Sequence, residues 1–176
     1  MQIKETNVTG AFVIDAQLHS DERGFFARVF DKDVLLQNGM DTDVHLSAVT
    51  FNHSAGTLRG MHYQSGAFAE TKFVRVTRGS VFDVVVDLRK QSPTYLKWHG
   101  EVLSADNHRQ LYIPKGCAHG YITLENNTEL TYLLSTPYSP THSEGVRYDD
   151  NAFNIAWPTE VKVIHPRDAG YADFIP

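Results

Sequence analysis

The sequence contains a single cysteine, Cys117, which excludes an internal disulfide framework and a zinc site built from several thiolates. It has no excess of positive charge, because 16 Lys and Arg stand against 21 Asp and Glu, a net charge of −5. Such an acidic chain is poorly suited to binding nucleic acid or an anionic lipid surface. It also lacks any run of about 18 apolar residues and any leading apolar stretch of signal-peptide length. These absences predict a cytoplasmic protein with no membrane or nucleic-acid partner.

What is present suffices for one folded domain. The 176 residues are 41% hydrophobic and 11% aromatic, which supplies a sizeable core and argues against disorder. The length is short for two domains, and the chain has no linker, low-complexity tract or internal repeat. We therefore expect a single domain over residues 1–176.

Short runs of strand-forming residues dominate the chain. Residues Val74 to Leu88 contain two β-branched runs separated by Gly79-Ser80, which predicts a hairpin. Further strands are predicted at Leu111–Pro114, His119–Leu124 and Glu129–Ser135. The only helix expected in the first half is Asp31–Asn38, with Gly39 as its stop. This pattern predicts an all-β sandwich or barrel with a few short helices, and the segment from Ser139 onward is expected to wrap its outside. Because such sheets have edges to cover, we expect a homodimer.

Two of the nine histidines lie in distinctive surroundings. His62 lies in the stretch TLRGMHYQ (57–64), and His119 lies in PKGCAHG (114–120). The second stretch has the pattern PxGxxH, which resembles the second motif of the cupin superfamily, a double-stranded β-helix or jelly-roll barrel. In metal-binding cupins the first motif carries a second histidine where this chain has Gln64, and Lys72 follows nearby. Since an amide and a lysine disfavour a transition metal, we expect a cupin barrel with no metal and no other cofactor.

Several other residue sets occur in a fixed order along the chain. They are RGFF (23–26), TLRGMHYQ (57–64), KFVRV (72–76), GSVFDVVVDLR (79–89), SPT (92–94), PKGCAHG (114–120), Tyr132, Tyr138, Glu144-Gly145 and IAWP (155–158). Taken together from about Gly10 to Asp168, they resemble the dTDP-4-dehydrorhamnose 3,5-epimerase family of cupin enzymes. Considered alone, Tyr132 is better explained as a core aromatic, Lys72 as a surface lysine and Arg59 as the partner of a carboxylate, so it is the joint pattern that indicates a site.

The resemblance implies four catalytic residues. His62 matches the general base, and Asp168, in the stretch His165-Pro166-Arg167-Asp168, matches the aspartate that orients it. Tyr132 matches the acid on the opposite face of the sugar, and Lys72 matches the group that faces the enolate oxygen. Removal of a proton beside a ketone needs a base, an acid and a cation near the oxygen, and these residue types supply all three.

The same resemblance implies a set of substrate-binding residues. Arg59 and His119 match positions that hold the diphosphate and the sugar, Tyr138 matches the aromatic that stacks on the base, and Gln64, Glu144 and Arg167 match further ligand positions. Arg23, Phe26 and Arg28 match an arm that crosses into the partner subunit's site.

Two departures from the family pattern concern the substrate. The stretch Leu46 to Thr50 lacks a Gln-x-Asn pair that touches the ligand, and the arm carries Arg28 where a carboxylate is common. An arginine only donates hydrogen bonds, so it cannot accept the N3–H of thymine. Two interpretations stay open: a CDP-linked sugar read by Arg28, or a dTDP-linked sugar with Arg28 directed to a phosphate.

The leading hypothesis is an epimerase that inverts C3, C5 or both in a dTDP- or CDP-linked 4-keto-6-deoxyhexose through an enolate. A metal-dependent cupin oxygenase that uses His62, Glu70 and His119 is a second hypothesis, and Gln64 argues against it. A sugar-binding cupin without activity is a third, and the joint presence of His62, Lys72 and Tyr132 argues against that one.

Overall fold

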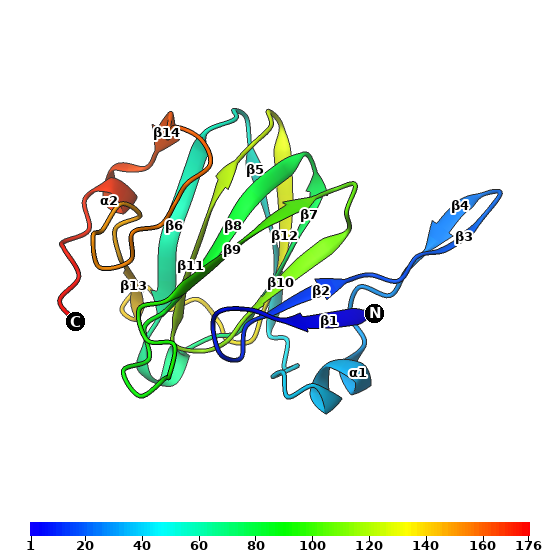
Figure 1. Ribbon diagram of the computed structural model, residues 1–176, viewed down its shortest axis with the longest axis horizontal. Coiled ribbons are helices and arrows are strands. Elements are labelled where there is room, and N and C mark those ends of the chain that lie inside the picture. The colour runs from blue at the N-terminus through cyan, green and yellow to red at the C-terminus, as the bar shows by residue number, and fades with distance from the viewer.

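The computed structural model describes residues 1–176 and consists of two antiparallel sheets packed face to face (Figure 1). The first sheet has the order β1 (Gln2–Glu5), β2 (Phe12–Asp15), β10 (Arg109–Ile113), β7 (Lys72–Arg78), β12 (Thr128–Leu134) and β5 (Leu46–Asn52). The second has the order β13 (Ser143–Gly145), β6 (Thr57–Gln64), β11 (Cys117–Thr123), β8 (Ser80–Asp87) and β9 (Trp98–Ser104). A short strand, β14 (Val163–Ile164), pairs in parallel with β6. This arrangement confirms the predicted all-β, cupin-type jelly roll.

The predicted hairpin between Val74 and Leu88 is wrong. Strands β7 and β8 both exist, but β7 pairs with β10 and β12, whereas β8 pairs with β11 and β9 in the other sheet. The chain crosses between the sheets at Gly79, whose φ of +73° suits glycine. A Cβ at this position would lie 2.4 Å from the hydroxyl oxygen of Thr128. Gly79 is therefore a turn residue, as predicted, but this turn joins the two sheets and not two paired strands.

The main hydrophobic core fills one end of the space between the sheets. Each strand alternates its side chains between the two faces, and the inward residues meet in the middle. Fully or almost fully buried members of this core are Val8, Ala11, Val13, Val74, Val76, Val81, Val85, Leu103, Leu111, Ile113, Cys117, Tyr121 and Leu130. Tyr132 of β12 is partly buried and packs against this cluster.

The C-terminal segment covers the outer face of the second sheet, as expected. Outward side chains of β6, β8 and β11, among them Met61, Val84 and Ala118, pack with Phe153 and Trp157 of that segment. Strands β13 and β14 both pair with β6, and the short helix α2 (Pro166–Ala169) follows β14 (Figure 1). The late part of the sequence is thereby brought to the side of β6.

The N-terminal part contributes a helix and a projecting hairpin. Helix α1 (Lys32–Gln37) is capped by Asp31 and followed by Gly39 at φ +76°, which confirms the predicted helix. Strands β3 (His19–Asp21) and β4 (Gly24–Phe26) form a two-stranded hairpin, here called the arm, that extends away from both sheets (Figure 1). A single turn of 3-10 helix, Gly66–Phe68, follows β6. Neither α-helix has the length and apolar character needed to span a membrane.

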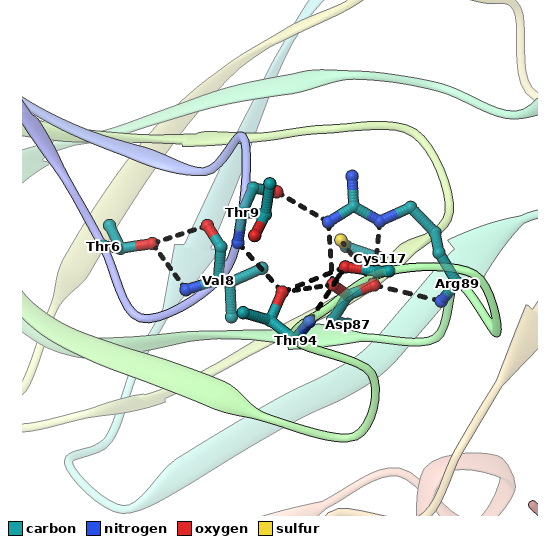
Figure 2. Close-up of polar contacts among 8 residues, drawn as sticks. Thr6, Val8, Thr9, Asp87, Arg89, Thr94 and Cys117 are labelled. Carbon is teal, nitrogen blue, oxygen red and sulfur yellow. Dashed lines mark hydrogen bonds and ion pairs between the residues drawn. The ribbon is translucent and has the colours of Figure 1, made fainter.

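A buried carboxylate fastens the N-terminal loop to the end of β8 (Figure 2). Asp87 is fully buried and accepts hydrogen bonds from Arg89, Ser92 and Thr94. Arg89 also donates to the carbonyl of Thr9, and the Thr94 hydroxyl accepts from the Thr9 N–H. Burial alone would raise the pKa of Asp87, but these donors lower it to about 2. We call this group the Asp87 anchor.

Candidate active site

A cavity of about 300 Å³ lies between the two sheets, beyond the apolar core. Strands of both sheets line it, and the polar side chains among its walls point to a site for a polar ligand. The lining residues are Ala48, Thr50, Arg59, His62, Glu70, Lys72, His119, Tyr121, Tyr132, Leu134 and Tyr138. Six of the thirteen predicted site residues line this cavity: Arg59, His62, Lys72, His119, Tyr132 and Tyr138. The other seven do not.

His62 lies on β6, directly opposite His119 on β11. Its Nε2 lies 2.8 Å from Oδ1 of Asp168, and the other carboxylate oxygen accepts from the Gly60 N–H at 3.2 Å. Asp168 is almost completely buried on α2, where His165 caps the helix by accepting from the Arg167 N–H. The structure thus joins two residues separated by 106 positions into a His–Asp pair, the contact that the family resemblance implies.

The electrostatic surroundings keep His62 neutral and Asp168 charged. Burial lowers the pKa of His62 below its ordinary value of 6.5, and nearby Lys72 and Arg167 lower it too, while Asp168 opposes the shift. For Asp168, burial would raise the pKa, but hydrogen bonds from His62, Gly60 and Arg167 hold it below 3.8. A neutral imidazole held by a carboxylate is suited to accept a proton.

Lys72 and Tyr132 belong to the first sheet, on the neighbouring strands β7 and β12. The ammonium group of Lys72 is almost buried, pairs with Glu70 at 3.2 Å and donates to the backbone carbonyl of His62 at 3.3 Å. Burial raises the pKa of Tyr132 well above 10, so its hydroxyl stays protonated at neutral pH. The ring of Tyr132 meets that of His119 edge-on, with centroids 6.1 Å apart. His62 of one sheet and Lys72 and Tyr132 of the other therefore line the same cavity.

Arg59, His119 and Tyr138 are the predicted binding residues that line the cavity. Arg59 donates to the side-chain oxygen of Asn52 at 2.8 Å, and His119 pairs with buried Asp83 at 2.7 Å. Tyr138 is 64% exposed, so it lies at the mouth of the cavity. Arg167 lies outside this cavity but beside His62, with its Nη2 3.1 Å from Nε2 of that ring.

Arg23 and Phe26 of the arm, and Arg28 just after it, do not line the cavity of their own chain. Arg23 pairs with Asp21 within the arm, and Phe26 is 64% exposed. Arg28 pairs with Asp31 at the start of α1, 3.2 Å away. Within one chain, Arg28 is therefore paired with a carboxylate at the start of α1.

Gln64 and Glu144 also lie outside the cavity. Gln64 is buried, donates to Glu70 at 3.0 Å and accepts from the Ser139 N–H at 2.7 Å, so it ties two loops together. Glu144 accepts from the Tyr63 hydroxyl at 2.7 Å and from Ser65. Contacts of these two side chains with a ligand stay predictions.

Two carboxylates near the site form ion pairs that the sequence did not predict. Asp83 interrupts the apolar run of β8 and is fully buried, and such an isolated acid within a buried strand was a usable signal. Glu70 was considered only as a metal ligand. The structure pairs it with Lys72, and the chain nowhere brings three or more His, Cys, Asp or Glu side chains together as a metal-binding group. The geometry thus gives no support to the oxygenase hypothesis.

Comparisons with known proteins show which family this chain is similar to. The model of the family described as dTDP-4-dehydrorhamnose 3,5-epimerase matches residues 5–175. An enzyme of that name from Shigella flexneri is 38% identical over 178 residues, which cover 99% of this chain and 97% of the relative.

Solved structures show the same similarity. That of the Bacillus anthracis dTDP-4-dehydrorhamnose 3,5-epimerase, with TDP and PPi bound, superposes with a TM-score of 0.94 at 40% identity, covering 98% of this chain and 99% of that one. A 3'-monoepimerase from Streptomyces bikiniensis in complex with dTDP-quinovose superposes with a TM-score of 0.88 at 30% identity, covering 96% of this chain and 85% of that one.

Proposed function

The chain belongs to the dTDP-4-dehydrorhamnose 3,5-epimerase family, and from this membership we propose that it inverts C3 and C5 of a dTDP-linked 4-keto-6-deoxyhexose. Membership makes it a carbohydrate epimerase, an isomerase. The observation that carries the proposal is the placement of the His62–Asp168 pair on one side of the cavity and of Tyr132 and Lys72 on the other.

The proposed chemistry needs only side chains of the chain and the ketone of the substrate. C3 and C5 flank the C4 carbonyl, which acidifies their protons. His62 removes one of these protons, and the electron pair moves into the C4 oxygen to give an enolate. The ammonium of Lys72 stabilises that oxygen, and Tyr132 delivers a proton to the opposite face of the same carbon. Protons then equilibrate with water, which restores neutral His62 and protonated Tyr132.

The nucleotide of the proposed substrate is thymidine diphosphate. The Bacillus anthracis relative binds TDP, and the Streptomyces bikiniensis relative binds a dTDP-sugar. A CDP-linked substrate has no support from these relatives. Arg28, the residue that favoured CDP, forms an ion pair with Asp31 within its own chain.

We also propose that the active unit is a homodimer in which each arm reaches the partner's cavity. Phe25 and Phe26 of the arm are half-exposed or more. The outward face of β5 exposes Val49 and Phe51, while its inward residues Ala48 and Thr50 line the cavity. Apolar side chains that are exposed in one chain mark surfaces suited to burial against another. The predicted cytoplasmic location stays a prediction.

The experiment is proton NMR in D2O with dTDP-4-keto-6-deoxyglucose. Deuterium at both C3 and C5 is the expected result, deuterium at one carbon would identify an epimerase of a single centre, and no exchange would overturn the proposal. His62→Ala should slow the exchange at least about 100-fold, because the base is lost. Tyr132→Phe should retain part of the proton loss and block inversion. His53→Ala, which removes an exposed histidine outside the cavity, is the matched control.

A further inference from the structure

One ring nitrogen of His62 lies within hydrogen-bond distance of two different groups. Its Nε2 is 2.8 Å from Oδ1 of Asp168 and 3.1 Å from Nη2 of Arg167. An imidazole nitrogen carries either one hydrogen or one lone pair in the ring plane. It can donate to the carboxylate or accept from the guanidinium, but it cannot do both. The two neighbours therefore compete for the same atom.

The outcome of this competition fixes where the neutral ring holds its lone pair. With Nε2–H donating to Asp168, Nδ1 is bare and can take a proton from a substrate. With Nε2 accepting from Arg167, Nδ1 carries the hydrogen, and the ring has no free lone pair for the substrate. Only the first tautomer is a competent base.

Arg167 is held loosely enough to leave His62. Its side chain is 53% exposed, and its other hydrogen bond is a single contact of 3.2 Å to Asp168. Beside it lies a second hollow of about 460 Å³, which Arg59, His62 and Arg167 line together. Arg59 and His62 also line the first cavity, so the two hollows adjoin. An anion in the second hollow would meet two guanidinium groups and draw Arg167 away from the ring.

We propose that Arg167 is a positioning residue that couples binding of the substrate's diphosphate to the tautomer of His62. In the free protein it occupies Nε2 and keeps part of the population in the incompetent tautomer. A bound diphosphate takes over the guanidinium, Nε2–H turns to Asp168, and Nδ1 becomes the base. The inference rests on the proposed function, because it takes the diphosphate of a nucleotide sugar as the ligand.

The charged groups that face His62 come from two elements. Asp168 and Arg167 belong to α2, and Lys72 belongs to β7, while the ring of Tyr171 lies edge-on at 6.4 Å. Lys72 is tied to Glu70 and to the carbonyl of His62 and does not contact Nε2. Among these groups, Arg167 is the cation that contacts the ring nitrogen directly.

Nitrogen-15 NMR of the histidine side chains tests the proposal. The spectra are recorded at about pH 8, where His62 is neutral, and the His62→Ala spectrum assigns its signals. In the wild type, saturating dTDP should shift the tautomer ratio toward Nε2–H by about 5-fold or more, and inorganic diphosphate should act in the same direction. In Arg167→Gln, the ring should already be in the Nε2–H form, and dTDP should not change it. Lys162→Ala, which removes an exposed cation of the same segment, should behave as the wild type.

The outcomes separate this inference from the proposed function. Binding of dTDP, measured by calorimetry, without any change of the His62 tautomer would overturn the role of Arg167 and leave the epimerase proposal standing. An unchanged response to dTDP in Arg167→Gln would overturn it as well. Absence of dTDP binding to the wild type would overturn the proposed nucleotide and the inference with it.

Discussion

The pKa of His62 is governed first by burial, and this sets the pH range of the proposed reaction. Burial favours the neutral ring, so the pKa lies below 6.5, and the base stays deprotonated down to a lower pH than an exposed histidine would. We therefore expect kcat/KM for exchange to fall on the acid side with a midpoint below pH 6.5. Tyr132 stays protonated far above neutral pH, so it should cause no alkaline fall below pH 10. A pH profile of the exchange rate measures both limbs, and an acid limb above 6.5 would contradict this account.

Variants of Lys72 and Glu70 can separate the effect of the Lys72 charge on the exchange rate from its effect on the free energy of unfolding. Lys72→Met removes the cation beside the enolate oxygen and should lower kcat by about 100-fold or more. It also leaves the carboxylate of Glu70 almost buried without its partner, which should cost about 3 kcal/mol in the free energy of unfolding.

The double variant Lys72→Met/Glu70→Gln is the control for this prediction. It removes both charges of the pair, so most of the lost stability should be recovered while exchange stays slow. Denaturant unfolding measures that recovery. Recovery of the exchange rate in the double variant would show that Lys72 has only a structural role.

At the scale of single residues, the sequence predicted individual site residues better than the contacts between them. The resemblance assigned roles to His62 and Asp168, and the structure places them in contact. The contact of Arg167 with His62 was not predictable, because it depends on how α2 docks against β6. The same holds for Gln64, whose hydrogen bonds to two loops remove it from the cavity.

At the scale of elements, the Asp87 anchor ties the N-terminal loop to the end of β8. Asp87→Asn replaces one acceptor oxygen by an NH2 group that faces Arg89, Ser92 and Thr94. We expect a loss of about 3 kcal/mol and a fall in Tm of roughly 10 °C, measured by calorimetry near neutral pH. Asp106→Asn, an exposed carboxylate on the β9–β10 loop, is the matched control and should leave Tm unchanged.

The pH dependence gives a second readout of the same anchor. The folded pKa of Asp87, about 2, lies below its ordinary value of 3.8, so its stabilisation is complete above 3.8 and is lost as the pH falls toward 2. The free energy of unfolding of Asp87→Asn should therefore decline less steeply over that range than that of the wild type. Equal slopes would contradict the assignment.

Strand positions were predictable where strand partners were not. The β-branched runs on both sides of Gly79 did identify β7 and β8, because such residues fit a pleated, buried surface. The same preference says nothing about which strand lies alongside. Here the partners of β7 begin at residues 109 and 128, far from it in sequence, so local pattern favoured the wrong pairing.

At the scale of the whole molecule, the proposed arm exchange can be tested by mixing two impaired variants. Each site would combine His62 of one chain with Arg23 of the other. His62→Ala and Arg23→Ala homodimers should both be impaired, but a heterodimer of the two contains one fully native site. After the subunits have re-assorted in a 1:1 mixture, the rate of deuterium incorporation into the substrate should recover to about a quarter of the wild-type value per chain.

The same mixture also tests the assembly itself. Sedimentation should give twice the chain mass of 19.8 kDa, and no recovery of activity from a dimeric mixture would mean that Arg23 acts in its own chain or not at all. An arm was expected from the family resemblance, whereas its extension away from both sheets became visible only in the fold (Figure 1).

The order of the strands also governs what a growing chain can form on the ribosome. Among residues 1–104, the only strand pairs are β1 with β2, β3 with β4 and β8 with β9. Strands β5, β6 and β7 find their neighbours only in β10–β14, which span residues 109–164. Until those residues emerge, three strands have open edges that can pair with other nascent chains. Synthesis of the C-terminal strands therefore sets the moment at which the polypeptide escapes aggregation.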